Sequence, residues 1–450
     1  SLTFMESMEM SLKKRKHAEA LRFVYDAQMP KDFQNYLIKK MGLNTKAQLY
    51  DGGRYHNFKD FIKFPTLGKT HLLNPIQEHI PHPDIDGTRS ILNKLKTKDV
   101  LLYFPYHSFD YFLDLLREAA IDPNVSHIRV TLYRVANQSH VIKSLITALH
   151  NGKDVTVFIE IRARFDEEAN LDWATKLRDA GAKVIPGISG LKVHSKLCLI
   201  TRREKGAKVY YACIGTGNLH EKTARIYTDA MLLTCNQTLT KEARLLFSFF
   251  DKNYSVPKFN HLLVAPFNLR SKLKTLINKE IKNAKAGKKA EIILKLNNLV
   301  DEDVIEKLYV AGKAGVKIKL IVRGINSIIP QISGFSDNIE AISIVDKFLE
   351  HTRIFSFYND GKPQVFIGSG DLMTRNLDFR IEVITPIFDE KIKKQLLKIL
   401  ELQWSDTVKA RLYNDIQNNP FRKMPLNEKP IRSQDAIYDF WKDFSVKKKR

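Results

Sequence analysis

The same order of predicted elements occurs twice in this 450-residue chain, and this repetition limits the possible folds more than any other feature. Residues 127–165 have the pattern of strand, helix and strand, with an amphipathic helix over 140–153. Residues 290–325 repeat that order, with a helix over 303–315. Units of this kind predict parallel strands covered by helices. We therefore expect an α/β fold with two halves related by duplication.

A histidine followed two positions later by a basic residue also occurs in each half. His194 and Lys196 lie in GLKVHSKLCLI (190–200), and His351 and Arg353 lie in LEHTRIF. A glycine-rich turn follows each pair, GTGN (215–218) in the first half and GSGD (368–371) in the second. Alternation along a continuous strand would place His194 and Lys196 on one face. The matching motifs support the duplication and single out these four side chains.

Two halves packed about a pseudo-twofold axis would bring both pairs to one site. An imidazole is often neutral near pH 7, can attack phosphorus and can pass the phosphoryl group on. The neighbouring cations would neutralise charge on the transferring oxygens. Backbone amides of the glycine turns could add donors, although a simple turn also explains these glycines. We therefore predict that His194, His351, Lys196 and Arg353 are catalytic residues of phosphoryl transfer.

Further basic residues fall at predicted strand ends, where α/β proteins place ligand sites. Aligning the two halves sets Arg134 opposite Asn297, and Arg164 and Arg323 end the following strands. Three arginines at comparable positions favour a phosphate clamp, because guanidinium groups bind phosphate in a bidentate manner. Tyr227 could stack on a nucleotide base, but a core tyrosine is the more common case.

The acidic run after Arg164 has two readings. Asp166, Glu167 and Glu168 could hold a metal ion. Acidic residues are also typical of the first turn of a helix, which is the interpretation we favour.

The amino-acid composition indicates which ligands the protein can bind and in which compartment it is found. Lys and Arg number 73 against 50 Asp and Glu, and the net charge of +23 favours polyanions such as nucleic acid, phosphorylated metabolites, inorganic polyphosphate or anionic lipid. Cys198, Cys213 and Cys235 follow no metal-ligand spacing and are expected to be free thiols in a reducing compartment. No apolar run is long enough to cross a bilayer. We expect a cytoplasmic protein that a basic surface could hold against a membrane.

The doubled His-x-basic motif with its glycine turns resembles the phospholipase D superfamily. It departs from the usual pattern because the aspartate expected after each basic residue is replaced by Thr201 and Tyr358. Longer stretches resemble the bacterial polyphosphate kinase family, ATP:polyphosphate phosphotransferases that use Mg²⁺, and these are YRVANQS, ARFDEEAN, GLKVHSKL, IGTGNLHEKTARIYTD, LKLNNLVD and MTRNLDFRIEV.

This resemblance implies roles for individual residues. His194 matches the histidine that is phosphorylated by ATP and then donates to polyphosphate, and His351 matches a second histidine at the nucleotide phosphates. Tyr227 and Arg323 match nucleotide-binding positions. Arg134 and Arg164 match the magnesium-phosphate environment, where a guanidinium contacts phosphate because it has no lone pair for a metal.

The resemblance also implies a domain organisation. Helix-like residues 11–29 and 29–43 belong to part of a helical head domain over 1–95, followed by two phospholipase D-like catalytic domains over 96–258 and 259–450. Members of the family carry further amino-terminal sequence, so we expect a fragment of a longer protein that is a homo-oligomer in full-length form.

Two other functions are also compatible with the sequence. A phosphodiesterase of the phospholipase D type, acting on nucleic acid or lipid, also uses two histidines. A non-catalytic nucleic-acid binder is supported by the charge alone, because we find no recognised binding module and expect no specific nucleic-acid partner.

Overall fold

The computed structural model describes residues 4–15, 18–43, 46–55, 57, 61, 64–136, 138–161, 163, 167–424 and 426–447. The chain divides into two compact units, Ser1–Ile76 and Gln77–Arg450. The domain boundaries expected near residues 95 and 258 stay predictions.

The first unit is a small mixed α/β structure. Helices α1 (Phe4–Arg15) and α2 (Lys31–Lys40) accompany a two-stranded parallel sheet of β1 (Phe23–Asp26) and β2 (Leu49–Gly52). The helical interpretation of residues 11–29 is therefore wrong for Phe23–Asp26. The run FVYD contains β-branched and aromatic residues that favour a strand once a partner strand is present.

The second unit contains two halves with a similar order of elements. The first half comprises α3 (Ile91–Leu95), β3 (Val100–Phe104), α4 (Asp110–Ile121), β4 (Val125–Leu132), α5 (His140–His150), β5 (Asp154–Ile159), α6 (Glu167–Asp179), β6 (Lys183–Ile185), β7 (Lys192–Val193), β8 (Lys196–Glu204), β9 (Ala207–Gly215), β10 (Tyr227–Thr234) and α7 (Gln237–Asp251).

The second half comprises β11 (Leu263–Ala265), α8 (Leu269–Lys285), β12 (Glu291–Leu296), α9 (Glu302–Lys313), β13 (Lys317–Val322), β14 (Ile339–Ile344), β15 (Leu349–Glu350), β16 (Ile354–Phe357), β17 (Gln364–Gly368), α10 (Thr374–Asp378), β18 (Arg380–Pro386), α11 (Glu390–Trp404), β19 (Ala410–Tyr413) and α12 (Ser433–Lys447).

The two sheets have matching topology. The first runs β10-β9-β8-β4-β5-β6 with β3 paired to β10, and the second runs β11-β18-β17-β16-β12-β13-β14-β19. Within each sheet the βαβ strands are parallel, β4 with β5 and β12 with β13. Equivalent helices have equivalent N-caps, since Ser139 caps α5 and Asp301 caps α9. The predicted α/β fold with two related halves is confirmed.

The register corrects the predicted alignment by one residue. The parallel pairings end at Leu132 in β4 and at Leu296 in β12. Arg134 is therefore equivalent to Asn298 rather than to Asn297. A sequence comparison without gaps cannot detect a shift of one residue between these strands. Both strands are buried and have hydrophobic residues at neighbouring positions, so two alignments fit almost equally well.

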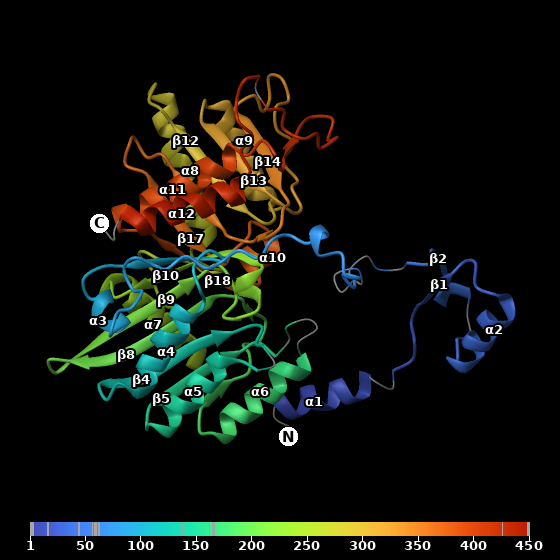
Figure 1. The fold of residues 1–450 in the computed structure, drawn as a ribbon, viewed down its shortest axis with the longest axis horizontal. Helices are drawn as coiled ribbons and strands as arrows, with labels where there is room; N and C mark the ends of the chain where they lie inside the picture. The colour runs from blue at the N-terminus through green and yellow to red at the C-terminus, as the bar shows by residue number, and fades with distance from the viewer. Residues whose placement is uncertain are drawn as a thin grey trace. The chain divides into compact units, whose positions relative to one another are not determined.

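The halves exchange their shortest strands. β7 belongs to the first half in sequence but pairs in parallel with β18, and β15 of the second half pairs in parallel with β10. Figure 1 shows β10 and β18 at the boundary between the halves. A buried apolar cluster continues across this boundary, containing Phe247 and Phe250 of α7, Leu396 and Ile399 of α11 and Trp441 of α12. Burial and strand exchange together fix the two halves to each other.

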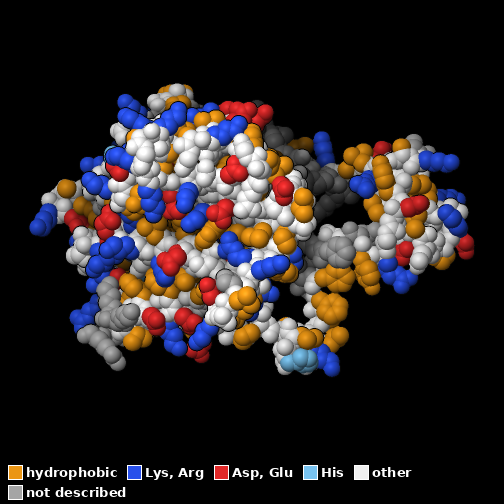
Figure 2. Space-filling view, turned by 90° about the horizontal axis from the view of Figure 1, so that it is seen from above, with side chains coloured by type: hydrophobic (Ala, Val, Ile, Leu, Met, Phe, Trp, Pro, Cys, Tyr) orange, Lys and Arg blue, Asp and Glu red, His pale blue; other side chains and the backbone are white. Residues whose placement is uncertain are grey.

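The cysteines, the helix lengths and the surface charge also bear on predictions made from the sequence. The three cysteines are free, with Cys198 and Cys213 buried on paired positions of β8 and β9. Within the described ranges, every helix is too short or too polar to span a bilayer. On the face seen in Figure 2, Lys and Arg side chains are interspersed with Asp and Glu, so the charge there is spread out rather than gathered in one patch.

Candidate active site

His194 lies at a break between two strands and is bound by a carboxylate of the other half. β7 ends at Val193 and β8 begins at Lys196, so the predicted continuous strand is wrong. The backbone N–H groups of His194 and Ser195 both donate to the carbonyl of Ile381 in β18. Nδ1 of His194 lies 2.8 Å and 3.0 Å from the two carboxylate oxygens of Glu382. This contact requires the strand exchange that carries β7 onto β18.

His351 has the reciprocal arrangement. Its Nδ1 lies 2.9 Å and 3.0 Å from the carboxylate oxygens of Asp229 on β10 of the first half. A carboxylate can only accept, so in both imidazoles Nδ1 carries the hydrogen and Nε2 keeps its lone pair. The two histidine side chains are almost equally exposed, at 14% for His194 and 13% for His351.

The glycine-rich turns orient these carboxylates. Oγ1 of Thr216, in GTGN, donates to Asp229, and Oγ of Ser369, in GSGD, donates to Glu382. A side chain on Gly217 would overlap the carboxylate of Asp229, which explains that glycine by close approach. The middle hydroxyl of each turn therefore acts on the histidine through an acid, a role that the sequence motif did not reveal.

Burial keeps both imidazoles neutral. It lowers the pKa of His194 to about 3, although the Glu382 carboxylate acts in the opposite direction. It lowers the pKa of His351 to about 4 against the opposing effect of Asp229. Two neutral histidines suit nucleophilic and proton-transfer chemistry at neutral pH.

Lys196 is a buried cation beside His194. Nζ donates to the carbonyl oxygen of His194 and lies 5.4 Å from the centre of the Tyr133 ring, which also meets the His194 ring edge-on at 4.9 Å. Burial, with the charges of Arg353 and Arg380, lowers the pKa of Lys196 to about 7.

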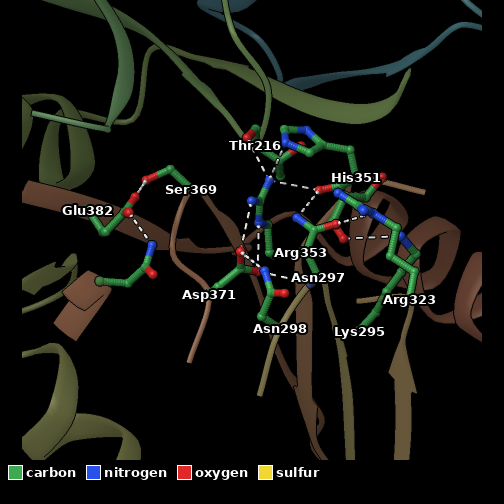
Figure 3. Close-up of polar contacts among 12 residues, drawn as sticks. Thr216, Lys295, Asn297, Asn298, Arg323, His351, Arg353, Ser369, Asp371 and Glu382 are labelled. Carbon is green, nitrogen blue, oxygen red and sulfur yellow. Dashed lines mark hydrogen bonds and ion pairs between the residues drawn. The ribbon is translucent and has the colours of Figure 1, made fainter. Parts of the chain in front are cut away.

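Arg353 is held more firmly than Lys196. Figure 3 shows its guanidinium between the carboxylate of Asp371 and the imidazole of His351. Nε and Nη2 each lie 3.2 Å from one oxygen of Asp371, while Nη1 lies 3.1 Å from Nε2 of His351. Asp371 in turn accepts from the backbone N–H of Asn297 at 2.9 Å and from the side chain of Asn298 at 3.2 Å.

The predicted nucleotide residues lie beside His351. The ring of Tyr227, at the start of β10, is 5.2 Å from the His351 ring. Nε of Arg323 donates to Oδ1 of Asn297 at 2.8 Å and to the carbonyl of Glu350 at 2.5 Å (Figure 3). Burial lowers the pKa of Arg323. The structure therefore brings Tyr227, Arg323, His351 and Arg353 together.

The residues predicted for the magnesium-phosphate environment are only partly described. Arg134 follows Tyr133 directly after β4, and it is the Tyr133 ring that contacts His194. Arg164 and Asp166 lie outside the described residues. Glu167 and Glu168 occupy the first turn of α6, as favoured from the sequence.

Carboxylates at the site do not form a magnesium cage. Over the residues that the structure describes, no group of three or more His, Cys, Asp or Glu could hold a metal ion. Asp229 and Glu382 are each committed to an imidazole, and Asp371 is committed to Arg353. The described donors therefore do not fit a protein-bound magnesium ion, which takes most of its ligands from free oxygen atoms.

Sequence reasoning missed five residues that complete the site: Tyr133, Asp229, Asp371, Arg380 and Glu382. The two acids that bind histidine occupy the third position of β10 and of β18, which are equivalent strands. Extending the internal alignment to IYTDAM and FRIEVI would have paired Asp229 with Glu382. An acid at equivalent positions of two buried strands was the available signal.

Comparisons with known proteins identify the family of the chain. The family model for polyphosphate kinase C-terminal domain 1 matches residues 90–256, and that for C-terminal domain 2 matches residues 262–434. The model for the polyphosphate kinase middle domain matches residues 1–64.

Curated and solved relatives extend the match over almost the whole chain. This chain is 50% identical over 441 residues to a polyphosphate kinase of Vibrio vulnificus and 47% identical over 443 residues to one of Escherichia coli. Each alignment covers 98% of this chain. The chain spans 63% and 64% of the lengths of these relatives. The crystal structure of polyphosphate kinase from Porphyromonas gingivalis superposes with a TM-score of 0.86 at 38% identity, over 95% of this chain and 65% of that one. The chain belongs to the polyphosphate kinase family.

Proposed function

We propose that this chain carries the catalytic centre of an ATP:polyphosphate phosphotransferase, with His194 as the phosphate-accepting nucleophile. The observation that carries the proposal is the hydrogen bonding of the two ring nitrogens of His194. Its Nδ1–H is bound by Glu382, and Nε2 accepts no hydrogen bond from any described residue. A neutral nitrogen lone pair held in one orientation is what an attack on phosphorus requires.

In the first step, Nε2 of His194 forms a bond to the γ-phosphorus of ATP while the bond from that phosphorus to the β,γ-bridging oxygen breaks. ADP leaves with the electron pair. The Nδ1–H group of His194 keeps its hydrogen bond to Glu382. The negative charge of this carboxylate stabilises the imidazole as it becomes a phosphoramidate. Lys196 and Arg353 neutralise the three equatorial oxygens of the transferring group.

In the second step, a terminal oxygen of polyphosphate attacks the phosphorus of phospho-His194. The phosphorus–nitrogen bond breaks and the lone pair returns to Nε2, so the chain gains one phosphate and the imidazole is restored. Each bond change is reversible, and the same site then makes ATP from ADP and polyphosphate. Tyr227, Arg323 and His351 contact the nucleotide in this proposal, because the Tyr227 ring contacts that of His351 and Arg323 binds the carbonyl of the preceding residue, Glu350.

Magnesium enters the proposal only as a companion of the nucleotide phosphates. The described side chains do not fit a protein-bound ion, and we derive no step through one. Arg134 and Arg164 would contact phosphate oxygens directly.

The test is incubation of the chain with γ-labelled ATP, followed by peptide mapping of the acid-labile label. We expect label on His194, removed by ADP or by polyphosphate, and none in His194→Ala. His261→Ala is a matched control, because His261 also pairs with a glutamate, Glu242, at 2.9 Å but lies outside the site. Label on another residue, or turnover of a phosphodiester without labelling by ATP, contradicts the proposal.

Some expectations concern the whole protein. Homo-oligomer formation, a cytoplasmic location with peripheral membrane contact, and the absence of a specific nucleic-acid partner stay predictions.

A further inference from the structure

The two halves of the site are nearly symmetric, but they differ at the basic residue that follows the histidine and at the last residue of the glycine turn. Each half contributes a histidine, and each histidine is bound by an acid that a turn hydroxyl orients. The basic residue after the histidine is Lys196 in one half and Arg353 in the other. The last residue of the glycine turn is Asn218 in one half and Asp371 in the other.

In the second half, this difference blocks the lone pair of the histidine. Nη1 of Arg353 donates to Nε2 of His351 at 3.1 Å and to the carbonyl of His351 at 2.8 Å. The bidentate contact with Asp371 fixes the plane of the guanidinium, and both residues are buried, at 3% and 5% exposure. A charged donor on Nε2 must be displaced before that nitrogen can attack an electrophile.

In the first half, the corresponding nitrogen is open. Lys196 directs Nζ to the carbonyl of His194 and has no carboxylate equivalent to Asp371. Oδ1 of Asn218 is buried without a hydrogen-bond partner among the described residues. The nearly equal exposure of the two histidines means that access to solvent does not distinguish them.

We infer that Asp371 is a positioning residue that makes the site chemically one-sided: by locking Arg353 onto Nε2 of His351, it reserves nucleophilic reactivity for His194. This inference rests on the proposed function for its biological meaning, but its chemical content concerns only the two imidazoles. His351 then remains beside the nucleotide residues as a neutral group whose lone pair is engaged.

The test measures the reactivity of each imidazole without any phosphoryl donor. The chain is treated with diethylpyrocarbonate, which modifies neutral imidazole nitrogen, and the rate at each histidine is followed by peptide mass spectrometry. We expect His194 to react roughly tenfold faster than His351 or more, the effect of one charge-assisted hydrogen bond. In Asp371→Asn, the rate at His351 should rise to about that of His194, while the rate at His194 stays unchanged.

Two further variants keep the test decisive if Asp371→Asn folds poorly. Arg353→Lys copies the first half and should also raise the rate at His351. Asp360→Asn removes an exposed carboxylate that pairs with Lys288 and should change neither rate. Equal rates in the unmodified chain, or no increase at His351 in folded Asp371→Asn and Arg353→Lys, would overturn the inference.

Labelling by γ-labelled ATP separates this inference from the proposed function. Unequal reactivity toward diethylpyrocarbonate without ATP labelling supports the one-sided site and contradicts the kinase proposal. Labelling of His194 by ATP, with equal reactivity of both histidines toward diethylpyrocarbonate, supports the kinase proposal and contradicts the one-sided site.

Discussion

Nδ1 of His194 lies 2.8 Å from Oε1 of Glu382, a residue 188 positions further along the chain and in the other half of the second unit. Although burial alone would raise the pKa of Glu382, its contacts with His194, Lys196 and Ser369 leave that pKa below its ordinary value. An ionised carboxylate therefore fixes the tautomer and the orientation of the proposed nucleophile.

Replacing Glu382 by Gln should slow phosphorylation of His194 by roughly tenfold to a hundredfold, the range for losing a hydrogen bond to a charged group. An amide can present either oxygen or nitrogen to Nδ1, so the correct tautomer is no longer enforced. Rapid-quench labelling with γ-labelled ATP gives the rate. Glu401→Gln changes an exposed glutamate on α11 and should have no effect. An unchanged labelling rate in Glu382→Gln would remove this acid from the mechanism.

Gly217→Ala should destabilise the protein, because its methyl group overlaps the carboxylate of Asp229. Overpacking of this kind costs about 1 to 3 kcal/mol and here also displaces the acid that binds His351. Gly215→Ala is the matched control in the same turn, since its nearest neighbour would lie at an ordinary contact distance of 3.4 Å. Chemical unfolding of both variants checks the difference, and equal stability would show that the turn adjusts.

Stability should fall as the pH is lowered from about 6.5 to 4. His194 and His351 of the candidate site have folded pKa values of about 3 and about 4 respectively, below the ordinary value of 6.5. The unfolded chain therefore binds more protons in this window, and acid favours unfolding. The two groups together contribute up to roughly 2 to 3 kcal/mol per pH unit. Urea titrations at several pH values measure this slope, which should be shallower in the double variant His194→Gln, His351→Gln.

The rate at low nucleotide concentration should decline as the pH rises through about 7. The Lys196 ammonium, with its pKa lowered to about 7 by burial and neighbouring cations, loses its proton in that range in the free protein. The pH dependence of kcat/KM reports groups of the free enzyme. Lys196→Arg keeps its charge and should move this decline to higher pH. A profile that is identical in the variant assigns the decline to another group.

The sequence predicted much of this architecture because duplication leaves a readable pattern. Repeated βαβ units gave the fold class, and the paired motifs located His194, Lys196, His351 and Arg353. Other features depend on contacts between distant segments. Asp229 and Glu382 are 122 and 188 residues from the histidines they bind, and the exchanged strands that bring them together are two residues long. No local periodicity predicts a strand of that length.

The error at residues 193–197 has the same origin. Alternation assumes one continuous strand. His194 instead lies after β7, which pairs with β18, and before β8, which belongs to the first sheet. The direction of the His194 side chain is therefore set by this passage from one sheet to the other, not by the alternation of side chains along a strand.

The reciprocal pairing of each histidine with an acid of the other half has a consequence for how such a duplicated protein diverges. After a gene segment is duplicated, two copies can normally accumulate changes independently. Here a substitution at Asp229 in the first copy acts on His351 in the second, and one at Glu382 acts on His194. Neither copy retains a complete histidine–acid pair of its own, so selection acts on the two as one inseparable sequence.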